Sequence, residues 1–190
     1  MKKKIILASS SPRRIEMMKK HGYDPIIRPA DIDETLPENI SSKDAVMFLA
    51  LKKALCIEQK ASPGSIIIAA DTVVYKDGIL GKPEDRGDAA RMLQKIKNTS
   101  HQVATGVCLL IAGEPVRNVF CDVTEVFCKD FSDAELSAYL DTDEPYDKAG
   151  AYAIQGIFAK HIDHYHGSFN TVVGFPWELI QPELARLLTL

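Results

Sequence analysis

The chain has 190 residues, 46% of them apolar, and its 23 lysines and arginines against 26 aspartates and glutamates give a formal net charge of −3. This length and composition predict one globular domain, or one domain with two lobes. Without a net positive charge, the chain has no electrostatic basis for binding a nucleic acid polymer or an anionic membrane surface.

The first residues predict a buried strand and not a secretion signal, because the apolar run Ile5-Ile6-Leu7-Ala8 is too short for a signal core. No run of eighteen apolar residues occurs, which excludes a helical membrane span. The four cysteines form no C-x-x-C pair, and three of them lie in apolar stretches, as free thiols do. We therefore expect a soluble protein of the cytoplasm.

Hydrophobic periodicity and turn residues predict the elements of the first half of the chain. These are a strand at 5–8, a helix with Ser11 as its cap and Pro12 as its first residue ending at Gly22, a short strand at 25–29, an acidic loop at 31–38, a helix from Ser41 or Ser42 to about Gln59, and a strand at 65–75 buried on both faces.

The second half begins with a hairpin and then becomes richer in strands. We expect a turn at 76–78 leading into 79–83, a helix at 88–97, a meander of strands at 102–111, 116–120 and 123–129, a helix capped at Ser132, a polar loop at 141–148, a strand at 158–162, a turn at 167–170 and a helix from Phe175 onward.

The segment from Ser9 to Arg14 suits an anion. It places hydroxyl groups and two guanidinium groups at the start of a helix, where free backbone amides and the helix dipole attract negative charge. Two arginines in a first turn oppose the dipole unless an anion compensates them. The segment therefore favours phosphate binding over a simple capped helix, and arginine can bind phosphate oxygens in pairs.

Asp71 is the most informative residue, because it interrupts an apolar strand. A carboxylate in such a strand is costly unless a metal, hydrogen bonds or a cation compensate it. The hairpin that follows would return Lys82 toward the level of Asp71. Asp33 and Glu34, in the acidic loop, offer oxygen ligands for Mg²⁺ or Mn²⁺, although Asp31 is an alternative.

Seven blocks of the sequence resemble the Maf family in order and spacing. They are Ser9-Ser10-Ser11-Pro12-Arg13-Arg14, Asp33-Glu34, Lys53-Ala54, Ala70-Asp71-Thr72-Val73-Val74, Gly81-Lys82-Pro83, Thr105-Gly106-Val107 and Lys148-Ala149-Gly150-Ala151-Tyr152-Ala153-Ile154-Gln155-Gly156. Each block alone is a weak signal, whereas the ordered set is specific and covers nearly the whole chain.

The resemblance implies a single Maf-like domain over residues 1–190, with an elongated, two-lobed α/β fold similar to that of the inosine triphosphate pyrophosphatases. Such a fold has a central mixed sheet and a nucleotide cleft. The resemblance also implies a homodimer, a divalent cation, Mg²⁺ or Mn²⁺, and hydrolysis of a nucleoside triphosphate to the monophosphate and pyrophosphate.

By the same resemblance, Asp71 is the catalytic proton acceptor, and Asp71 with Glu34 holds the metal. The residues that bind the phosphates are Ser9, Arg13, Arg14, Lys53 and Lys82. The residues associated with substrate choice are Arg13, Thr72 and Gln155, and they resemble the subgroup that hydrolyses dTTP and UTP. A glutamine amide both donates and accepts hydrogen bonds, which suits the imide edge of uracil or thymine.

Two alternatives remain open from the sequence. The chain could belong to a Maf subgroup that hydrolyses 7-methyl-GTP or other modified nucleotides. It could also act as a nucleotide-sensing regulator of cell division in which hydrolysis is incidental.

Overall fold

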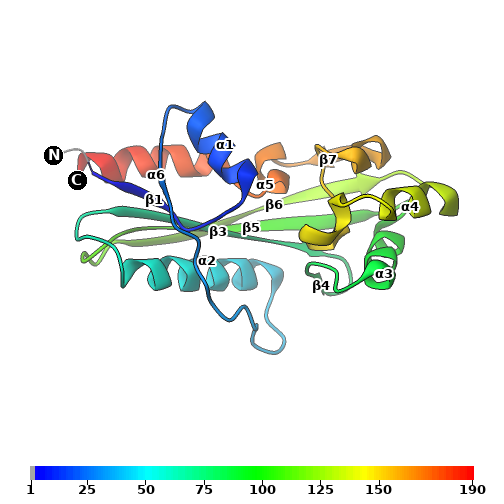
Figure 1. Ribbon diagram of the computed structural model, residues 1–190, viewed down its shortest axis with the longest axis horizontal. Coiled ribbons are helices and arrows are strands. Elements are labelled where there is room, and N and C mark those ends of the chain that lie inside the picture. Colours follow the sequence, from blue (N-terminus) through cyan, green and yellow to red (C-terminus); the bar gives the residue numbers. More distant parts are fainter. Residues whose placement is uncertain (1–2) are drawn as a thin grey trace. The chain divides into compact units, whose positions relative to one another are not determined.

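The computed structural model describes residues 3–190, which form two compact units (Figure 1). The first unit comprises the chain up to Asp71 together with Thr105–Asp122 and Gly174–Leu190, and the second comprises Thr72–Ala104 and Val123–Val173. Three long strands have residues in both units: β3 (Ile66–Tyr75), β5 (Ser100–Ile111) and β6 (Arg117–Cys128). That the units form one two-lobed domain stays a prediction.

The strands form one mixed sheet in the order β2-β1-β3-β5-β6-β7, with β4 paired to β3. The short strands are β1 (Ile5–Leu7), β2 (Ile26–Ile27), β4 (Ile79–Leu80) and β7 (Ile162–His166). β1 runs parallel to β2 and β3, whereas β4 pairs antiparallel with β3 and β7 antiparallel with β6. The expected α/β class with a mixed sheet is confirmed.

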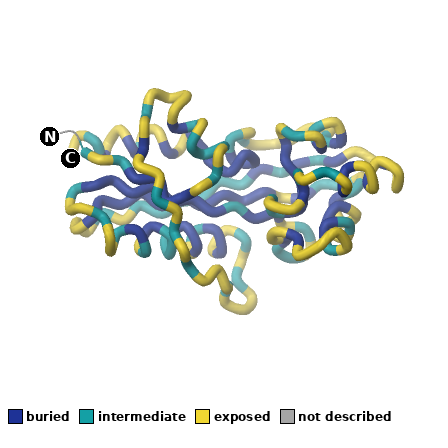
Figure 2. Tube along the Cα trace, viewed as in Figure 1, coloured by how far each residue is buried: buried dark blue, intermediate teal, exposed yellow. Residues whose placement is uncertain are grey.

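In the first unit, helices cover both faces of the sheet. Ile66 and Ile68 of β3 pack with α1 (Pro12–Lys20) and α6 (Trp177–Thr189), while Ile67 and Ala69, on the other face, pack with α2 (Ser42–Glu58) (Figure 1). Because both faces are covered, β3 is apolar at successive positions and not only at alternate ones, as the sequence predicted. Figure 2 shows the resulting buried strands beneath helices with exposed outer surfaces.

Two close contacts tie the helices of the first unit to their neighbours. A Cβ atom on Gly106 of β5 would overlap the main-chain carbonyl of Val46 on α2, so only glycine allows this approach. The chain's only tryptophan, Trp177, stacks on His21 with 4.3 Å between the ring centroids and is 3% exposed.

The second unit packs short helices on its part of the sheet. They are α3 (Arg86–Ile96), α4 (Asp133–Leu140), α5 (Phe169–Val173) and three 3₁₀ helices, η1 (Glu144–Asp147), η2 (Ala149–Ala151) and η3 (Ile157–His161). Ser132 caps α4 through a reciprocal capping box with Glu135, which confirms the predicted cap. The core of this unit includes Leu93, Val103, Tyr152 and Phe158.

Four predictions of secondary structure are wrong. The turn predicted at 167–170 is shorter, because α5 begins at Phe169. β6 is one continuous strand and not two separated at Asp122, because a single polar residue on a half-exposed strand does not end the pairing. Residues 157–161 form η3, and the strand comes later, at β7. The expected side-chain cap from Ser11 on α1 does not form, although Pro12 is the first helical residue as predicted.

Within residues 3–190 there is no helix whose length and apolar character would let it cross a lipid bilayer.

Candidate functional site

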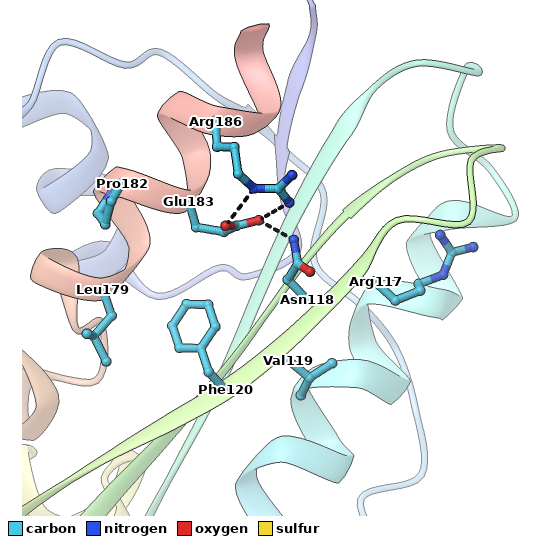
Figure 3. Close-up of a pocket in the computed structure, with 8 residues that line it drawn as sticks. All are labelled: Arg117, Asn118, Val119, Phe120, Leu179, Pro182, Glu183 and Arg186. Atoms are coloured by element: carbon cyan, nitrogen blue, oxygen red, sulfur yellow. Dashed lines mark hydrogen bonds and ion pairs between the residues drawn. The ribbon is translucent and has the colours of Figure 1, made fainter. Parts of the chain in front are cut away.

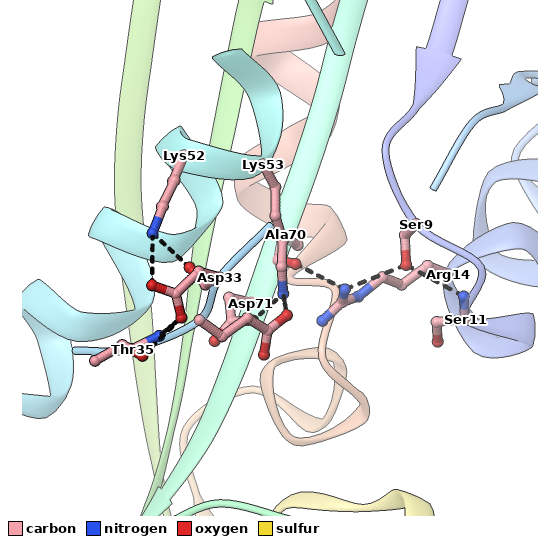
Figure 4. Close-up of polar contacts among 10 residues, drawn as sticks. Ser9, Ser11, Arg14, Asp33, Thr35, Lys52, Lys53, Ala70 and Asp71 are labelled. Carbon is pink, nitrogen blue, oxygen red and sulfur yellow. Dashed lines mark hydrogen bonds and ion pairs between the residues drawn. The ribbon is translucent and has the colours of Figure 1, made fainter. Parts of the chain in front are cut away.

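The centre of the candidate site, in the first unit, is Lys53, whose ammonium lies between two carboxylates. Its Nζ atom is 2.5 Å from Oδ1 of Asp71 (Figure 4). The same atom is 2.7 Å from Oε1 of Glu34. The Lys53 and Asp71 side chains are only 13% and 11% exposed, whereas Glu34 is 56% exposed. The cation thus compensates the carboxylate that interrupts the apolar strand.

Secondary structure explains how these three residues meet. Asp71 lies on β3 directly after the buried residues Ala69 and Ala70, which pack against opposite faces of the first unit. Lys53 comes from the middle of α2, which Ser41 caps through a bond from the Asp44 amide. The cap fixes where the helix begins, and the helix packs along the sheet. Lys53 is therefore held beside Asp71 of β3.

Arg14 anchors the helix start to the strand beside Asp71. Its guanidinium donates to the carbonyl oxygen of Ala70, at 2.7 Å, and to Ser9 Oγ, at 3.3 Å (Figure 4). It also donates to the carbonyl oxygen of Gly174 at 2.9 Å. Burial lowers the pKa of Arg14 to about 10, and Asp71 partly opposes this shift. At neutral pH the side chain remains a cation.

The N-terminus of α1 brings together the other groups of the predicted anion site. Ser9 is buried, and its Oγ accepts a bond of 3.2 Å from the Ser11 amide. Arg13 lies in the first turn of α1, and its positive charge lowers the pKa of Arg14, which indicates that the two guanidinium groups share one region. The first unit therefore gathers positive charge and backbone amides beside the Asp71 carboxylate.

The three acidic residues of the loop, Asp31, Asp33 and Glu34, make different contacts. Asp33 accepts bonds from the amide and hydroxyl of Thr35, which lower the pKa of Asp33, and Lys52 contacts it at 4.0 Å (Figure 4). The Asp31 carbonyl accepts a weak bond from the Cys56 thiol. Glu34 is the one that bonds to Lys53, which favours it over Asp31 and Asp33 as the partner of Asp71.

Asp71 and Glu34 fit a hard divalent cation whose other ligands are substrate phosphates and water. Their oxygens share one ammonium, so they lie near each other, and Mg²⁺ typically takes one or two carboxylates together with substrate phosphates and water. Within the described part of the chain, no group of three His, Cys, Asp or Glu side chains is arranged to hold a metal.

The second unit contains the remaining predicted residues. Thr72 is half-buried on β3, Lys82 is exposed two residues beyond β4, and Gln155 is exposed in the segment that precedes η3. The predicted hairpin is confirmed, because Val74 pairs with Leu80 and Tyr75 with Ile79.

Gly150 contacts residues of two other sequence blocks, Gly81 and Val74. Its amide donates to the Gly81 carbonyl at 2.9 Å, and a Cβ atom there would lie 2.7 Å from Cγ2 of Val74. Its φ of 68° also favours glycine. The blocks that contain Thr72, Lys82 and Gln155 are therefore in direct contact through their neighbours.

A groove of about 640 Å³ elsewhere in the first unit is a separate feature. It lies between β6 and α6, where Glu183 bonds to Asn118 and Arg186 (Figure 3). None of the site residues predicted from the sequence lines this groove.

Sequence reasoning missed two sets of groups. The carbonyls of Ala70 and Gly174 hold Arg14, but main-chain atoms leave no sequence signal. Glu144 lies in what looked like a solvated polar loop, yet its carboxylate binds three groups of the second unit. A glutamate beside a proline carries no pattern that reveals such a role.

Comparisons with known proteins agree with one another. The family model described as Maf-like protein matches residues 4–187. Proteins named dTTP/UTP pyrophosphatase from Caldicellulosiruptor bescii and Acetivibrio thermocellus are 43% and 41% identical to the chain, covering 97% and 91% of it and 95% and 90% of their own lengths. The solved structure of the Staphylococcus aureus Ham1 protein matches with a TM-score of 0.55 at 16% identity, over 97% of this chain and 99% of that one, a likeness of fold alone. The chain belongs to the Maf family.

Proposed function

We propose that the chain is a nucleoside triphosphate pyrophosphatase that hydrolyses dTTP and UTP to the nucleoside monophosphate and pyrophosphate. The observation that carries this proposal is the Lys53 ammonium held between Asp71 and Glu34, with the half-buried Arg14 guanidinium beside them. Cations and a carboxylate in one place meet the two needs of phosphoanhydride hydrolysis, charge neutralisation and a base. The names of the relatives support the same reaction.

Asp71 is assigned as the proton acceptor. Lys53 bonds to Oδ1, and we assign Oδ2 of the same carboxylate to the attacking water. The water oxygen forms a bond to the α-phosphorus while its proton passes to Asp71. The bond from the α-phosphorus to the bridging oxygen breaks, and its electron pair leaves with pyrophosphate.

The phosphate groups are assigned to Ser9, Arg13, Arg14, Lys53 and Lys82. Three hydrogen bonds already orient the Arg14 guanidinium, so its side chain loses little conformational entropy when it binds a phosphate. A divalent cation held by Glu34 and Asp71 would supply additional neutralisation of the triphosphate. Mg²⁺ or Mn²⁺ is proposed, because the ligands are carboxylate oxygens.

Substrate choice is assigned to Arg13, Thr72 and Gln155. The Gln155 amide is exposed, and it can donate to one carbonyl of the base and accept from the imide N–H of uracil or thymine. Cytosine has no N–H at that ring position, so one of the two bonds would be lost. This argument favours dTTP and UTP over CTP.

We also propose that the enzyme acts as a homodimer in the cytoplasm. The family resemblance supports the dimer. The free thiols of Cys56, Cys108, Cys121 and Cys128 are compatible with a reducing compartment.

The test is to incubate the purified chain with Mg²⁺ or Mn²⁺ and dTTP, UTP, CTP, dATP, GTP or 7-methyl-GTP, and to identify both products. Release of pyrophosphate and monophosphate from dTTP and UTP is expected, whereas orthophosphate and diphosphate would place the cleavage at the wrong bond. Preference for 7-methyl-GTP would overturn the substrate assignment and keep the chemistry. Absence of hydrolysis with binding intact would favour the nucleotide-sensing alternative.

A further inference from the structure

Glu144 binds the segment that follows Gln155. Its carboxylate accepts hydrogen bonds from the amides of Ile157, at 2.7 Å, and Phe158, at 3.2 Å. These are the first two residues of η3, so Glu144 satisfies amides that the 3₁₀ helix itself leaves without partners. Glu144, eleven positions before Gln155, therefore holds the segment that directly follows Gln155.

The carboxylate also lies directly against Gly156. A Cβ atom on Gly156 would overlap the Glu144 carboxylate, so a side chain there would displace it. The Gly156 amide donates to the Ala153 carbonyl at 3.2 Å and closes a turn whose third residue is Gln155. Gln155 is thus the exposed residue of a turn that begins at buried Ala153 and ends against Glu144.

Tyr139 connects Glu144 to the chain before this turn. Its hydroxyl lies 3.1 Å from Oε1 of Glu144 and 3.2 Å from the carbonyl oxygen of Ala151. Burial, together with the Glu144 charge, raises the pKa of Tyr139, so the hydroxyl keeps its proton and remains a donor. Ala151 is fully buried and has a φ of 61°, a conformation that needs such external support.

We propose that Glu144 is a positioning residue for base recognition, which holds the turn that presents Gln155 to the pyrimidine. This inference rests on the proposed function, because it assumes that Gln155 reads the base. Glu144 does not touch the reacting phosphates in this proposal. Its role is to reduce the number of orientations in which the amide of Gln155 meets the nucleotide.

An ionised carboxylate is well suited to this position. It accepts bonds through both oxygens and presents no hydrogen, whereas a glutamine amide would direct its N–H₂ group at one of the donors from Tyr139, Ile157 and Phe158. Tyr139 and Phe158 are buried, and a buried donor that loses its acceptor destabilises the arrangement. Glu144→Gln therefore keeps the size of the side chain while removing the hydrogen bonds that one of the two carboxylate oxygens accepts.

The test measures kcat and KM for dTTP, UTP and CTP in Glu144→Gln, Gln155→Ala and the double variant, with Asp143→Asn as the matched control for loss of one negative charge. We expect Glu144→Gln to raise KM for dTTP and UTP about tenfold, to change kcat less than about twofold, and to reduce the preference over CTP about tenfold. The double variant should be no worse than Gln155→Ala, because both changes act through one amide. Asp143→Asn should match the parent protein.

The outcomes separate the inference from the function on which it rests. If Gln155→Ala alters base preference and Glu144→Gln does not, the positioning role is overturned while the proposed function stands. If Gln155→Ala leaves base preference unchanged, Gln155 does not read the base and both assignments fall. Equal loss of kcat on every substrate would show a structural effect only. Should Glu144→Gln fail to fold, Gly156→Ala carries the test, because its methyl group displaces the carboxylate and should raise KM in the same way.

Discussion

Lys53 Nζ lies 2.5 Å from Oδ1 of Asp71, joining the middle of α2 to the strand that bears the proposed base. Both side chains are largely buried, and removal of one partner from a buried ion pair leaves the other charge uncompensated. Variants of either residue therefore report on stability as well as on catalysis. Each activity measurement needs an unfolding measurement beside it.

Asp71→Asn should lower kcat by roughly 10²- to 10⁴-fold, because an amide cannot accept the proton from water. Nucleotide binding should persist, since the cations remain. Pyrophosphate release and equilibrium binding of dTTP measure the two effects, with the exposed Asp24→Asn as the charge control. Activity of Asp71→Asn near the parent level would remove Asp71 from the mechanism.

Glu34→Gln should weaken the apparent affinity for Mg²⁺ at least tenfold in activity titrations, because Glu34 is the loop carboxylate that bonds to Lys53 beside Asp71. Asp31→Asn should change it little. A chelator should abolish activity in the parent protein, and added Mg²⁺ should restore it. A larger effect from Asp31→Asn than from Glu34→Gln would reverse the ligand assignment.

Arg14→Lys should lower kcat/KM at least about tenfold and destabilise the fold by about 2–4 kcal/mol, since lysine cannot reach Ala70, Gly174 and Ser9 at once. Urea unfolding gives the free energy. Arg28→Lys is the matched control, because Arg28 is an arginine that makes one solvent-exposed hydrogen bond, to the Lys60 carbonyl. Equal effects at the two positions would contradict the special role of Arg14.

Gly106→Ala should destabilise the protein by about 1–3 kcal/mol or more, because the added methyl group meets the main chain of α2 at Val46 and a helix backbone cannot rotate away. Gly81→Ala is the comparison, as open space surrounds that position. Thermal and urea unfolding measure both. A stable Gly106→Ala protein would mean that α2 shifts easily.

Acid should weaken the second unit through His101. Its ring is 2% exposed, its Nε2 lies 2.6 Å from the Tyr152 hydroxyl, and burial lowers the pKa of His101 from 6.5 to about 4. Because the unfolded chain binds the proton more readily, His101 contributes stability above pH 6.5 that is lost progressively as pH falls toward 4. The contribution is at most about 3 kcal/mol.

Urea unfolding between pH 4 and 7 measures this effect. His101→Gln should show a smaller loss of stability with falling pH than the parent protein, and the exposed His164→Gln should not. Parallel pH profiles for the parent and His101→Gln would rule out a neutral buried His101.

Local signals predicted most elements of the fold but few of the contacts at the site. Pro12, Ser41 and Ser132 marked helix starts because their effects act within one helical turn. The strand predicted at 158–162 was wrong because Glu144, more than ten residues earlier, binds the amides of Ile157 and Phe158 at the start of η3. The local sequence around η3 does not show that Glu144 binds it.

The site itself shows the same limit. Asp71 stood out because a carboxylate in an apolar strand needs compensation, and Lys53 was named from the family resemblance. Two of the site's contacts depend on how the helices dock on the sheet. Lys53 pairs with Asp71, and Arg14 donates to Gly174, which lies 160 positions later in the chain. The roles of these residues stay predictions until the variants are measured.

The stacked pair of Trp177 and His21 gives the first unit its own optical label. Since the chain has one indole and it is buried in the core of that unit, its fluorescence follows the loss of that core alone. Tyr139 and Tyr152, buried in the core of the second unit, contribute to the tyrosine bands of the near-ultraviolet dichroism. Recording both signals during one denaturant titration distinguishes concerted melting of the two units from stepwise melting.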